Sequence, residues 1–179
     1  MPGAATISKG TVKPHLEVEG DWGLSGDVKV SGAKNSALVL MAAGLLTENA
    51  LHLSNVPQLT DIEGMSEILS TLGVKLKRVG DELFLDPAKL HHAELPYDLV
   101  HGLRASFFCI GPLLARLGQA KIPLPGGCEI GARPVSEHIK GLKALGAYIS
   151  VEHGLVTAAI PGTKKRLKGA EIVLDCPSV

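Results

Sequence analysis

A glycine-rich stretch in the second half of the chain carries the residues most suited to chemistry. It runs from Pro125 to Val135 and contains Cys128, with Arg133 five residues later. Its glycines let the backbone adopt positive φ and approach a ligand closely. An arginine holds a phosphate or a carboxylate, and a nearby cation favours the thiolate form of a cysteine. The alternative is a surface turn with an incidental cysteine, and the residues by themselves leave both interpretations open.

A second candidate is the segment Ser31–Ser36, which joins an expected strand to an apolar helix. Lys34 and Asn35 then lie near a helix N-terminus, where unpaired backbone N–H groups favour anions. The segment lacks the P-loop spacing, so a helix cap with a solvated lysine is the alternative. Arg104 occupies a comparable corner before the second apolar helix. The two basic corners therefore indicate one shared anion site.

The cysteines and histidines form no metal-binding or redox motif. Cys109, Cys128 and Cys176 are an odd number without paired short spacings, so neither a disulfide framework nor a Cys-x-x-Cys motif follows from them. The histidines are scattered without ligand spacing, and we expect no metal and no cofactor. Cys109 and Cys176 are interpreted as structural. His138, at the start of the helix after the glycine-rich loop, either faces that loop or bonds to backbone or water.

The composition narrows the class of protein that must position these residues. The chain has 179 residues, 45% hydrophobic and 20% charged, with 18 basic and 18 acidic side chains. This balance excludes charge-driven disorder and argues against a broad nucleic-acid or anionic-membrane footprint. Aromatic residues make up 3%, against 21 Gly and 11 Pro. We therefore expect a soluble, cytoplasmic α/β protein whose core is built from aliphatic side chains and cut by tight turns.

An internal repeat organises the elements. In the first half we expect a helix at Ser36–Leu46, a strand at Leu51–Leu53, a helix that starts from a capping box at Thr60–Glu63, and a hairpin around Gly80-Asp81. In the second half the same succession is expected, with a helix at Ala105–Leu117, a strand at Ala120–Leu124, a helix along Ile139, Leu142 and Leu145, and a hairpin around His153-Gly154. Leu72-Gly73 and Leu145-Gly146 mark equivalent corners of the two units.

The repeat sets the expected boundaries. We place a flexible leader at 1–15, repeat units at about 26–88 and 97–162, and a connector at Pro87–Leu99. Two strands, Asp27–Val30 and Ala170–Leu174, would open the first unit and a third unit spanning 168–179. A last strand without its covering helix predicts that the chain is a fragment. The alternative is that this strand completes a sheet at a natural C-terminus.

The motifs together resemble the UDP-N-acetylglucosamine 1-carboxyvinyltransferases, a family of enolpyruvyl transferases. The resemblance runs from about Leu16 to Val179 and rests on Ser31–Asn35, Leu103–Ser106 and Pro125–Val135, with support from Asn55–Pro57, Tyr97–Leu99 and Gly111–Leu113. It implies an inside-out α/β barrel fold, with two similar domains of three such units each and an active site between them. This chain would hold two units and the first strand of a third, and the second domain would be missing.

The resemblance also implies a reaction and a set of residues. The enolpyruvyl group of phosphoenolpyruvate would pass to the 3-hydroxyl of UDP-N-acetylglucosamine, in the first committed step of peptidoglycan precursor synthesis. Cys128 would donate the proton and would be the residue that fosfomycin alkylates. Lys34 and Asn35 would bind phosphoenolpyruvate, with Arg133 also holding its charged groups. The residues implied for the nucleotide sugar are Arg104, Arg133, Pro134, Val135, Ser136, Glu137, Ser178 and Val179.

Two departures and two rivals accompany this resemblance. Cys176 and Pro177 differ from many relatives, which puts the contacts of these two side chains in doubt. The carboxylate base that deprotonates the sugar hydroxyl would belong to the second domain. The sister enzyme 5-enolpyruvylshikimate-3-phosphate synthase lacks the cysteine-bearing loop, so Cys128 with Arg133 argues against it. The other rival is a non-catalytic half-domain that binds a UDP-sugar or nothing.

Overall fold

The computed structural model describes residues 6–7, 16–20, 23–124, 135–162 and 166–175. The chain divides into two compact units, Met1–Val30 and Ser31–Val179. In the first, β1 (Thr6–Ile7), inside the predicted leader at 1–15, pairs antiparallel with β2 (Leu16–Glu17), which directly follows that leader. The predicted strand at 27–30 is wrong, because an alternating pattern makes a strand only when a neighbour pairs with it, and no described strand does.

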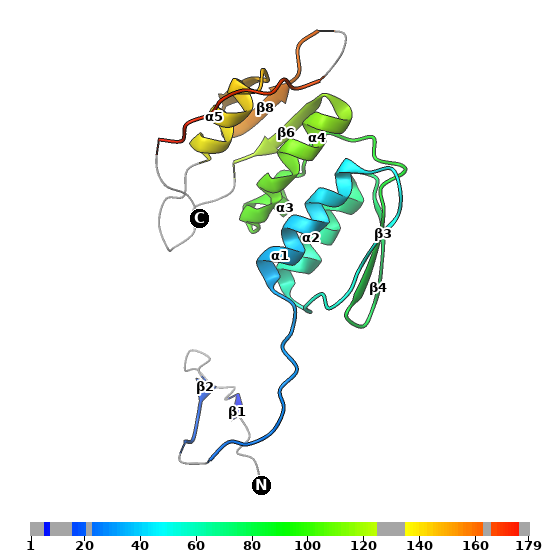
Figure 1. Ribbon diagram of the computed structural model, residues 1–179, viewed down its shortest axis with the longest axis vertical. Coiled ribbons are helices and arrows are strands. Elements are labelled where there is room, and N and C mark those ends of the chain that lie inside the picture. The colour runs from blue at the N-terminus through cyan, green and yellow to red at the C-terminus, as the bar shows by residue number, and fades with distance from the viewer. Residues whose placement is uncertain (1–5, 8–15, 21–22, 125–134, 163–165, 176–179) are drawn as a thin grey trace. The chain divides into compact units, whose positions relative to one another are not determined.

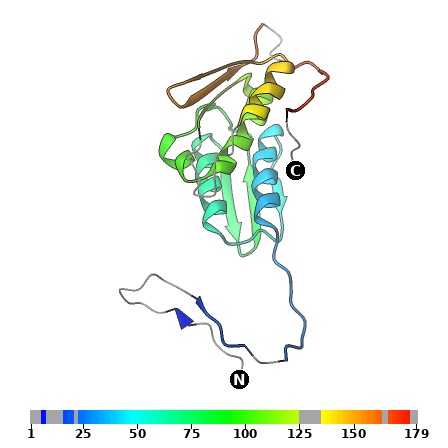
Figure 2. The ribbon, with the colours of Figure 1, turned by 90° about the vertical axis from the view of Figure 1, so that its left-hand side faces the viewer.

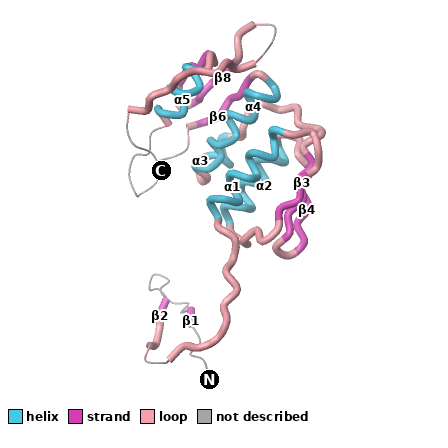
Figure 3. Tube along the Cα trace, viewed as in Figure 1, coloured by secondary structure: helices cyan, strands magenta, loops and turns pink. Residues whose placement is uncertain are grey.

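The first repeat of the second unit has the predicted succession of elements. Helix α1 (Lys34–Ala43) continues into the 3₁₀ turn η1 (Gly44–Leu46), followed by β3 (Leu51–Leu53) and α2 (Thr60–Thr71). The hairpin of β4 (Lys75–Val79) and β5 (Glu82–Asp86) completes it. The three strands form an antiparallel sheet in the order β3-β5-β4. Figures 1 and 3 show α1 and α2 gathered beside this sheet.

The second repeat reproduces this topology. A short helix α3 (Tyr97–His101) precedes η2 (Arg104–Cys109) and α4 (Ile110–Leu117), and β6 (Gln119–Pro123) and α5 (Ser136–Ala144) follow. The strands β7 (Tyr148–Glu152) and β8 (Leu155–Ala159) form a hairpin, and the sheet order is β6-β8-β7. Strands β4 and β7 begin 73 residues apart (148 − 75). The predicted repeat is therefore confirmed.

The same helix end occurs in both repeats. After α2, Gly73 has φ +101° and its N–H donates to Ser70 O, while Val74 N–H donates to Leu69 O. After α5, Gly146 has φ +94° and the two equivalent bonds form, to Lys143 O and Leu142 O. This is the Schellman arrangement, in which a glycine in the left-handed region satisfies the last carbonyls of the helix. The predicted corners at 72–73 and 145–146 are thus confirmed.

Two helix starts differ from the predicted ones. The expected helix Ala105–Leu117 is a 3₁₀ segment up to Cys109 and an α-helix only from Ile110. Pro112 explains the change, because its missing N–H and its ring are tolerated in the first turn of an α-helix but not in the interior. The predicted capping box is wrong as well. Thr60 is the first helical residue of α2, and Leu59, which has no capping side chain, is the N-cap.

Two further expectations are corrected in the connecting segments. Residues 170–174 are exposed and belong to no strand, since no described strand pairs with them. The connector before the second repeat is more structured than predicted. Glu94 forms a parallel bridge with Lys121 on β6, and Leu95 N–H donates to Lys121 O at 2.9 Å. α3 then begins at Tyr97, inside the segment interpreted as a linker.

A shared aliphatic core joins the two repeats. The predicted stripe of α2 is fully buried: Ile62, Met65, Ile68, Leu69 and Leu72 are each 0% exposed. α1 packs against α2 and η2, and α4 packs against η1, so the helices of both repeats contribute to one cluster. In Figure 2, turned by 90°, the colours of Figure 1 identify α1 and α2, which pack against each other. In the described part of the chain, no helix is long and apolar enough to cross a membrane.

Candidate functional site

The first basic corner lies at the start of α1. The helix begins at Lys34, and its N-cap, Ala33, offers no side chain to the first-turn N–H groups. Lys34 Nζ lies 2.6 Å from Asp61 Oδ2 in the first turn of α2. Both side chains are partly exposed, Lys34 at 46% and Asp61 at 35%. Lys34 is therefore held by an ion pair and is still accessible to a ligand. The alternative drawn from the sequence, a helix cap with a solvated lysine, did not include this ion pair.

The backbone before α1 is fixed by a close approach. Gly32 N–H donates to Asn55 Oδ1 at 3.2 Å, and a Cβ at residue 32 would lie 1.8 Å from Asn55 O. Asn55 itself has φ +55°, a conformation that asparagine tolerates better than most residues. Any side chain at 32 would displace one of the two segments. The glycine in the motif is thus explained by packing against the loop after β3.

A cavity of about 350 Å³ lies between the start of α1 and the segment after β3. Polar groups on its wall come from Ser36, His52, Ser54 and Asn55. In the sequence, Ser36 was used only as the start of a helix and His52 only as part of the strand predicted at Leu51–Leu53. The pairing of β3 with β5 places His52 here, where its ring stacks on Phe84 at 4.4 Å.

The second basic corner is Arg104, the first residue of η2. It is half-buried, and its side chain forms no hydrogen bond or ion pair with any described residue. η2 packs on α1, so the helical segments that begin with Lys34 and Arg104 lie side by side. Two cations at the starts of neighbouring segments fit an anion-binding role, and the single shared anion stays a prediction. Ser106, two residues after Arg104, is fully buried, and its Oγ has no hydrogen-bond partner among the described residues.

The start of α5 holds the described part of the predicted nucleotide-sugar segment. Val135 is its buried N-cap residue and Ser136 its exposed first residue. Glu137 Oε2 accepts a hydrogen bond from Asp175 N–H at 3.0 Å. His138 places its ring edge-on against Phe107 of η2, with 5.6 Å between the ring centroids. This contact joins the start of α5 to the segment that begins with Arg104.

The remaining predicted site residues lie outside the described residues. They are Cys128, Arg133, Pro134, Ser178 and Val179, and the neighbouring Cys176 and Pro177 lie outside them as well. The described chain reaches Leu124 on one side of the glycine-rich loop and resumes at Val135. Leu124 N–H donates to Gly154 O at 2.6 Å, which fixes the point where the chain leaves β6.

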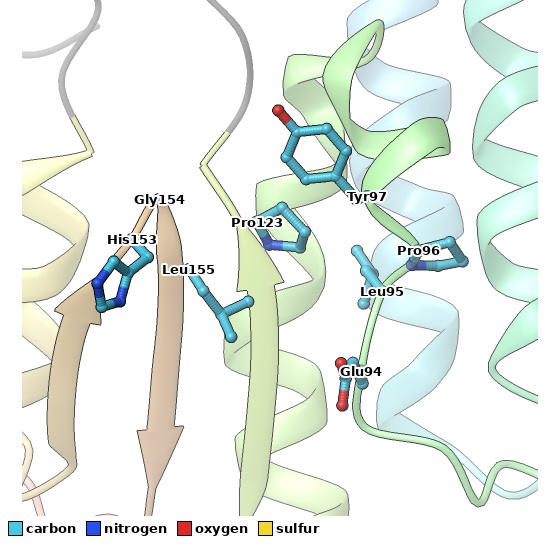
Figure 4. A pocket seen from close by; sticks show the side chains of 8 residues that line it. All are labelled: Glu94, Leu95, Pro96, Tyr97, Pro123, His153, Gly154 and Leu155. Atoms are coloured by element: carbon cyan, nitrogen blue, oxygen red, sulfur yellow. The ribbon is translucent and has the colours of Figure 1, made fainter.

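A second cavity lies at this end of β6. It has a volume of about 470 Å³, and Figure 4 shows Pro123 and Leu155 on one side and Tyr97 on the other. His153 lines it from the β7–β8 turn, where it has φ +49°. No sequence motif pointed to this place, because its lining comes from three separate segments brought together by the sheet.

The described cysteine is not reactive. Cys109 is fully buried at the end of η2, and desolvation by burial raises the pKa of its thiol to about 12. The neutral thiol therefore persists throughout the physiological range, because burial penalises the charged thiolate. This supports the interpretation of Cys109 as a core residue. Among the described residues, no group of three or more His, Cys, Asp or Glu side chains is arranged to hold a metal ion.

Comparisons with known proteins agree with this architecture. Residues 18–179 match the family described as EPSP synthase (3-phosphoshikimate 1-carboxyvinyltransferase). The whole chain is 68% identical to a UDP-N-acetylglucosamine 1-carboxyvinyltransferase of Prochlorococcus marinus (strain MIT 9313), and 62% identical to one of Synechococcus sp. (strain CC9605). The chain spans 41% of the length of each of these two curated relatives.

Two solved structures share the fold. The enolpyruvyl transferase NikO from Streptomyces tendae has a TM-score of 0.68 at 24% identity, over 81% of this chain and 31% of that one. An EPSP synthase from Acinetobacter baumannii has a TM-score of 0.62 at 20% identity, over 86% of this chain and 35% of that one. These likenesses confirm the predicted α/β fold.

Proposed function

The chain belongs to the EPSP synthase (3-phosphoshikimate 1-carboxyvinyltransferase) family, and from this premise we propose that its protein is a UDP-N-acetylglucosamine 1-carboxyvinyltransferase. The observation that carries the proposal is the 68% identity, over the whole chain, to a relative of that name. Because the chain spans about two fifths of that relative, the activity is proposed for a protein of the relative's full length. We further propose that it works in the cytoplasm, in peptidoglycan precursor synthesis.

The proposed reaction joins two substrates by addition and elimination. The 3-hydroxyl oxygen of UDP-N-acetylglucosamine attacks C2 of phosphoenolpyruvate and loses its proton to a base, while the C3 methylene gains a proton. The resulting tetrahedral ketal then loses phosphate from C2 and a proton from C3, which restores the alkene. Anionic groups are present on both substrates throughout, so fixed cations that face them would stabilise the charge that develops.

Lys34 and Asn35 are proposed to bind phosphoenolpyruvate. The position of Lys34 supports this role, because its ammonium group is exposed and lies in the first turn of α1 with no capping side chain nearby. An arriving phosphate would compete with the Asp61 carboxylate for the same ammonium group, or share it. Arg104, beside α1 on η2, is proposed to hold the nucleotide sugar through its charged groups.

The glycine-rich loop is proposed to supply the acid. Cys128 would protonate the methylene carbon, and fosfomycin would alkylate the same thiol. Arg133 would hold charged groups of phosphoenolpyruvate, and residues 133–137, with Ser178 and Val179, would contact the nucleotide sugar. The position of Val135 and Ser136 at the start of a helix that touches η2 supports this assignment. No metal and no cofactor are part of the proposal.

The proposed site is divided along the sequence. The base that deprotonates the sugar hydroxyl is assigned to a second domain, in the part of the relatives that this chain does not span. A site split in this way cannot close on its substrates when one part is missing. The 179-residue chain alone should therefore release no phosphate from phosphoenolpyruvate in the presence of the sugar nucleotide.

The test is phosphate release by a protein of the relatives' full length, with phosphoenolpyruvate and either of two acceptors. UDP-N-acetylglucosamine should support turnover, and 3-phosphoshikimate, the acceptor that the family description favours, should not. Cys128→Asp should retain some transfer because a carboxylic acid also delivers a proton, and Cys128→Ala should not. Turnover with 3-phosphoshikimate alone would replace the proposal by the sister reaction. No turnover with either acceptor would favour a non-catalytic protein.

A further inference from the structure

The segment after the second repeat is attached to α5 at both ends of the helix. Lys168 N–H donates to Leu145 O at 2.9 Å, just beyond the C-terminal end of α5. Seven residues later, Asp175 N–H donates to Glu137 Oε2 at 3.0 Å in the first turn. The carboxylate of Asp175 also pairs with Lys140 Nζ. The chain between these points forms no strand and is exposed, so the contacts with α5 determine its path.

Asp175 is held by two oppositely charged side chains of α5. Glu137 and Lys140 are three positions apart on α5, which puts their side chains next to each other on one helix face. The Glu137 carboxylate accepts a hydrogen bond from the backbone N–H of Asp175, and the Lys140 ammonium group donates to the Asp175 carboxylate. A single salt bridge would leave Asp175 free to rotate about its side chain. Contacts with both backbone and side chain fix its position and its orientation together.

Stability does not account for this arrangement. Lys140 is 41% exposed and Asp175 73% exposed, and ion pairs at such sites contribute little to folding. What the contacts achieve is positional: they join two stretches that are 38 residues apart in sequence. One stretch begins α5 directly after the glycine-rich loop, and the other leads into the residues that follow Asp175. The resemblance assigns both neighbourhoods to the same nucleotide sugar.

We propose that Glu137 and Lys140 are positioning residues that clamp Asp175 and so hold the segment that ends with it against the first turn of α5, the described part of the proposed nucleotide-sugar site. This rests on the proposed function. It revises the role expected for Glu137, whose carboxylate is engaged by a backbone N–H of the protein and would repel the pyrophosphate of the ligand. Glu137 therefore acts on the ligand through Asp175, not by direct contact.

The clamp itself is tested in the 179-residue chain, without any activity. Amide hydrogen exchange should show Asp175 protected, with protection falling about three- to tenfold in Glu137→Ala, the range of one net hydrogen bond. Glu137→Gln should keep most of the protection, because its amide oxygen accepts the same bond. Lys143→Gln, an exposed lysine on the same helix, is the matched control. Equal exchange in all four proteins would overturn the clamp, whatever the enzyme does.

Its role is tested in a protein of the relatives' full length. Lys140→Glu should raise KM for UDP-N-acetylglucosamine about three- to tenfold, with kcat and KM for phosphoenolpyruvate changed less than twofold. Adding Asp175→Lys should restore most of that loss, because the reversed pair attracts again. Failure of the reversal to rescue, while hydrogen exchange supports the clamp, would overturn the positioning role. If neither acceptor is turned over by the unsubstituted protein, the proposed function has failed and the exchange result stands by itself.

Discussion

The two equivalent glycines offer a matched test of how the repeats are built. Gly73 and Gly146 both follow a helix, both have φ near +100°, and both complete the same pair of hydrogen bonds. Their surroundings differ. A Cβ at Gly73 would lie 2.4 Å from Lys89 O and 2.5 Å from His91 Nδ1, whereas a Cβ at Gly146 would meet nothing within 4 Å. Alanine at the two positions therefore separates backbone strain from steric conflict.

The expected costs follow from these distances. Gly146→Ala should lower the free energy of unfolding by about 1–2 kcal/mol, the cost of a left-handed conformation for a residue with a Cβ. Gly73→Ala carries the same strain and must also move the backbone at 89–91. That displacement weakens the bonds from the N–H groups of His91 and His92 to Leu72 O, at 3.2 and 3.4 Å. At about 1 kcal/mol for each bond, the total is about 3–4 kcal/mol.

Urea unfolding of the chain, followed by circular dichroism, measures both costs. Asparagine variants sharpen the comparison, because Asn adopts the left-handed region with less strain but still has a Cβ. Gly146→Asn should fall within about 0.5 kcal/mol of the unsubstituted chain, and Gly73→Asn should still lose about 2 kcal/mol. Equal losses at the two positions would refute the steric argument, and would mean that the connector moves at no cost.

Three further outcomes are expected. Arg116→Ala should lower the free energy of unfolding, measured in the same urea titration, by about 2–3 kcal/mol, because the largely buried guanidinium donates to Leu45 O at 3.0 Å and to Thr47 O. The control is Glu48→Ala, which removes an exposed partner 3.8 Å from Arg116 and should change the free energy of unfolding by less than about 0.5 kcal/mol. Lys34→Ala at full length should reduce kcat/KM for phosphoenolpyruvate about ten- to hundredfold with a melting temperature changed by little, and unchanged kinetics would restore the capping-only interpretation. Cys109 has its thiol pKa raised by burial from 9.0 to about 12, so the folded state keeps the proton that the unfolded state releases. Stability should therefore be fully present below pH 9 and fall between pH 9 and 12, by up to about 1.4 kcal/mol per pH unit relative to Cys109→Ala.

The elements that the sequence predicted well are those with strong local signals. The stripe of α2 has apolar residues at helical spacing, and both hairpins have a glycine at the turn, where Gly80 has φ +61° and Gly154 has φ +77°. A repeat doubles these signals, since each half supports the interpretation of the other. The apolar helix predicted from Ser36 is also present, but it begins two residues earlier, at Lys34.

The two strands that were predicted wrongly share one cause, which is that a strand depends on a partner strand elsewhere in the sequence. Asp27–Val30 and Ala170–Leu174 have strand-like composition, but a strand forms only where another strand supplies the ladder hydrogen bonds. The bridge of Glu94 to Lys121 shows the reverse case, because a segment with two histidines and two prolines nearby is ordered by a sheet edge. Pro112 alone gave a local warning, since a proline rarely occupies the interior of a helix.

The candidate site depends even more on distant partners. Lys34 was singled out as a cation at a helix start, but its pairing with Asp61 follows from the packing of α1 on α2, which no motif encodes. Glu137 was assigned through resemblance, and its hydrogen bond to Asp175 across 38 residues gives it a different task. The contact of His138 with Phe107 likewise joins the helix after the glycine-rich loop to the segment of Arg104. Residue types thus indicate which side chains are charged, but the fold decides whether a charged side chain faces a ligand or instead holds another segment of the protein in place.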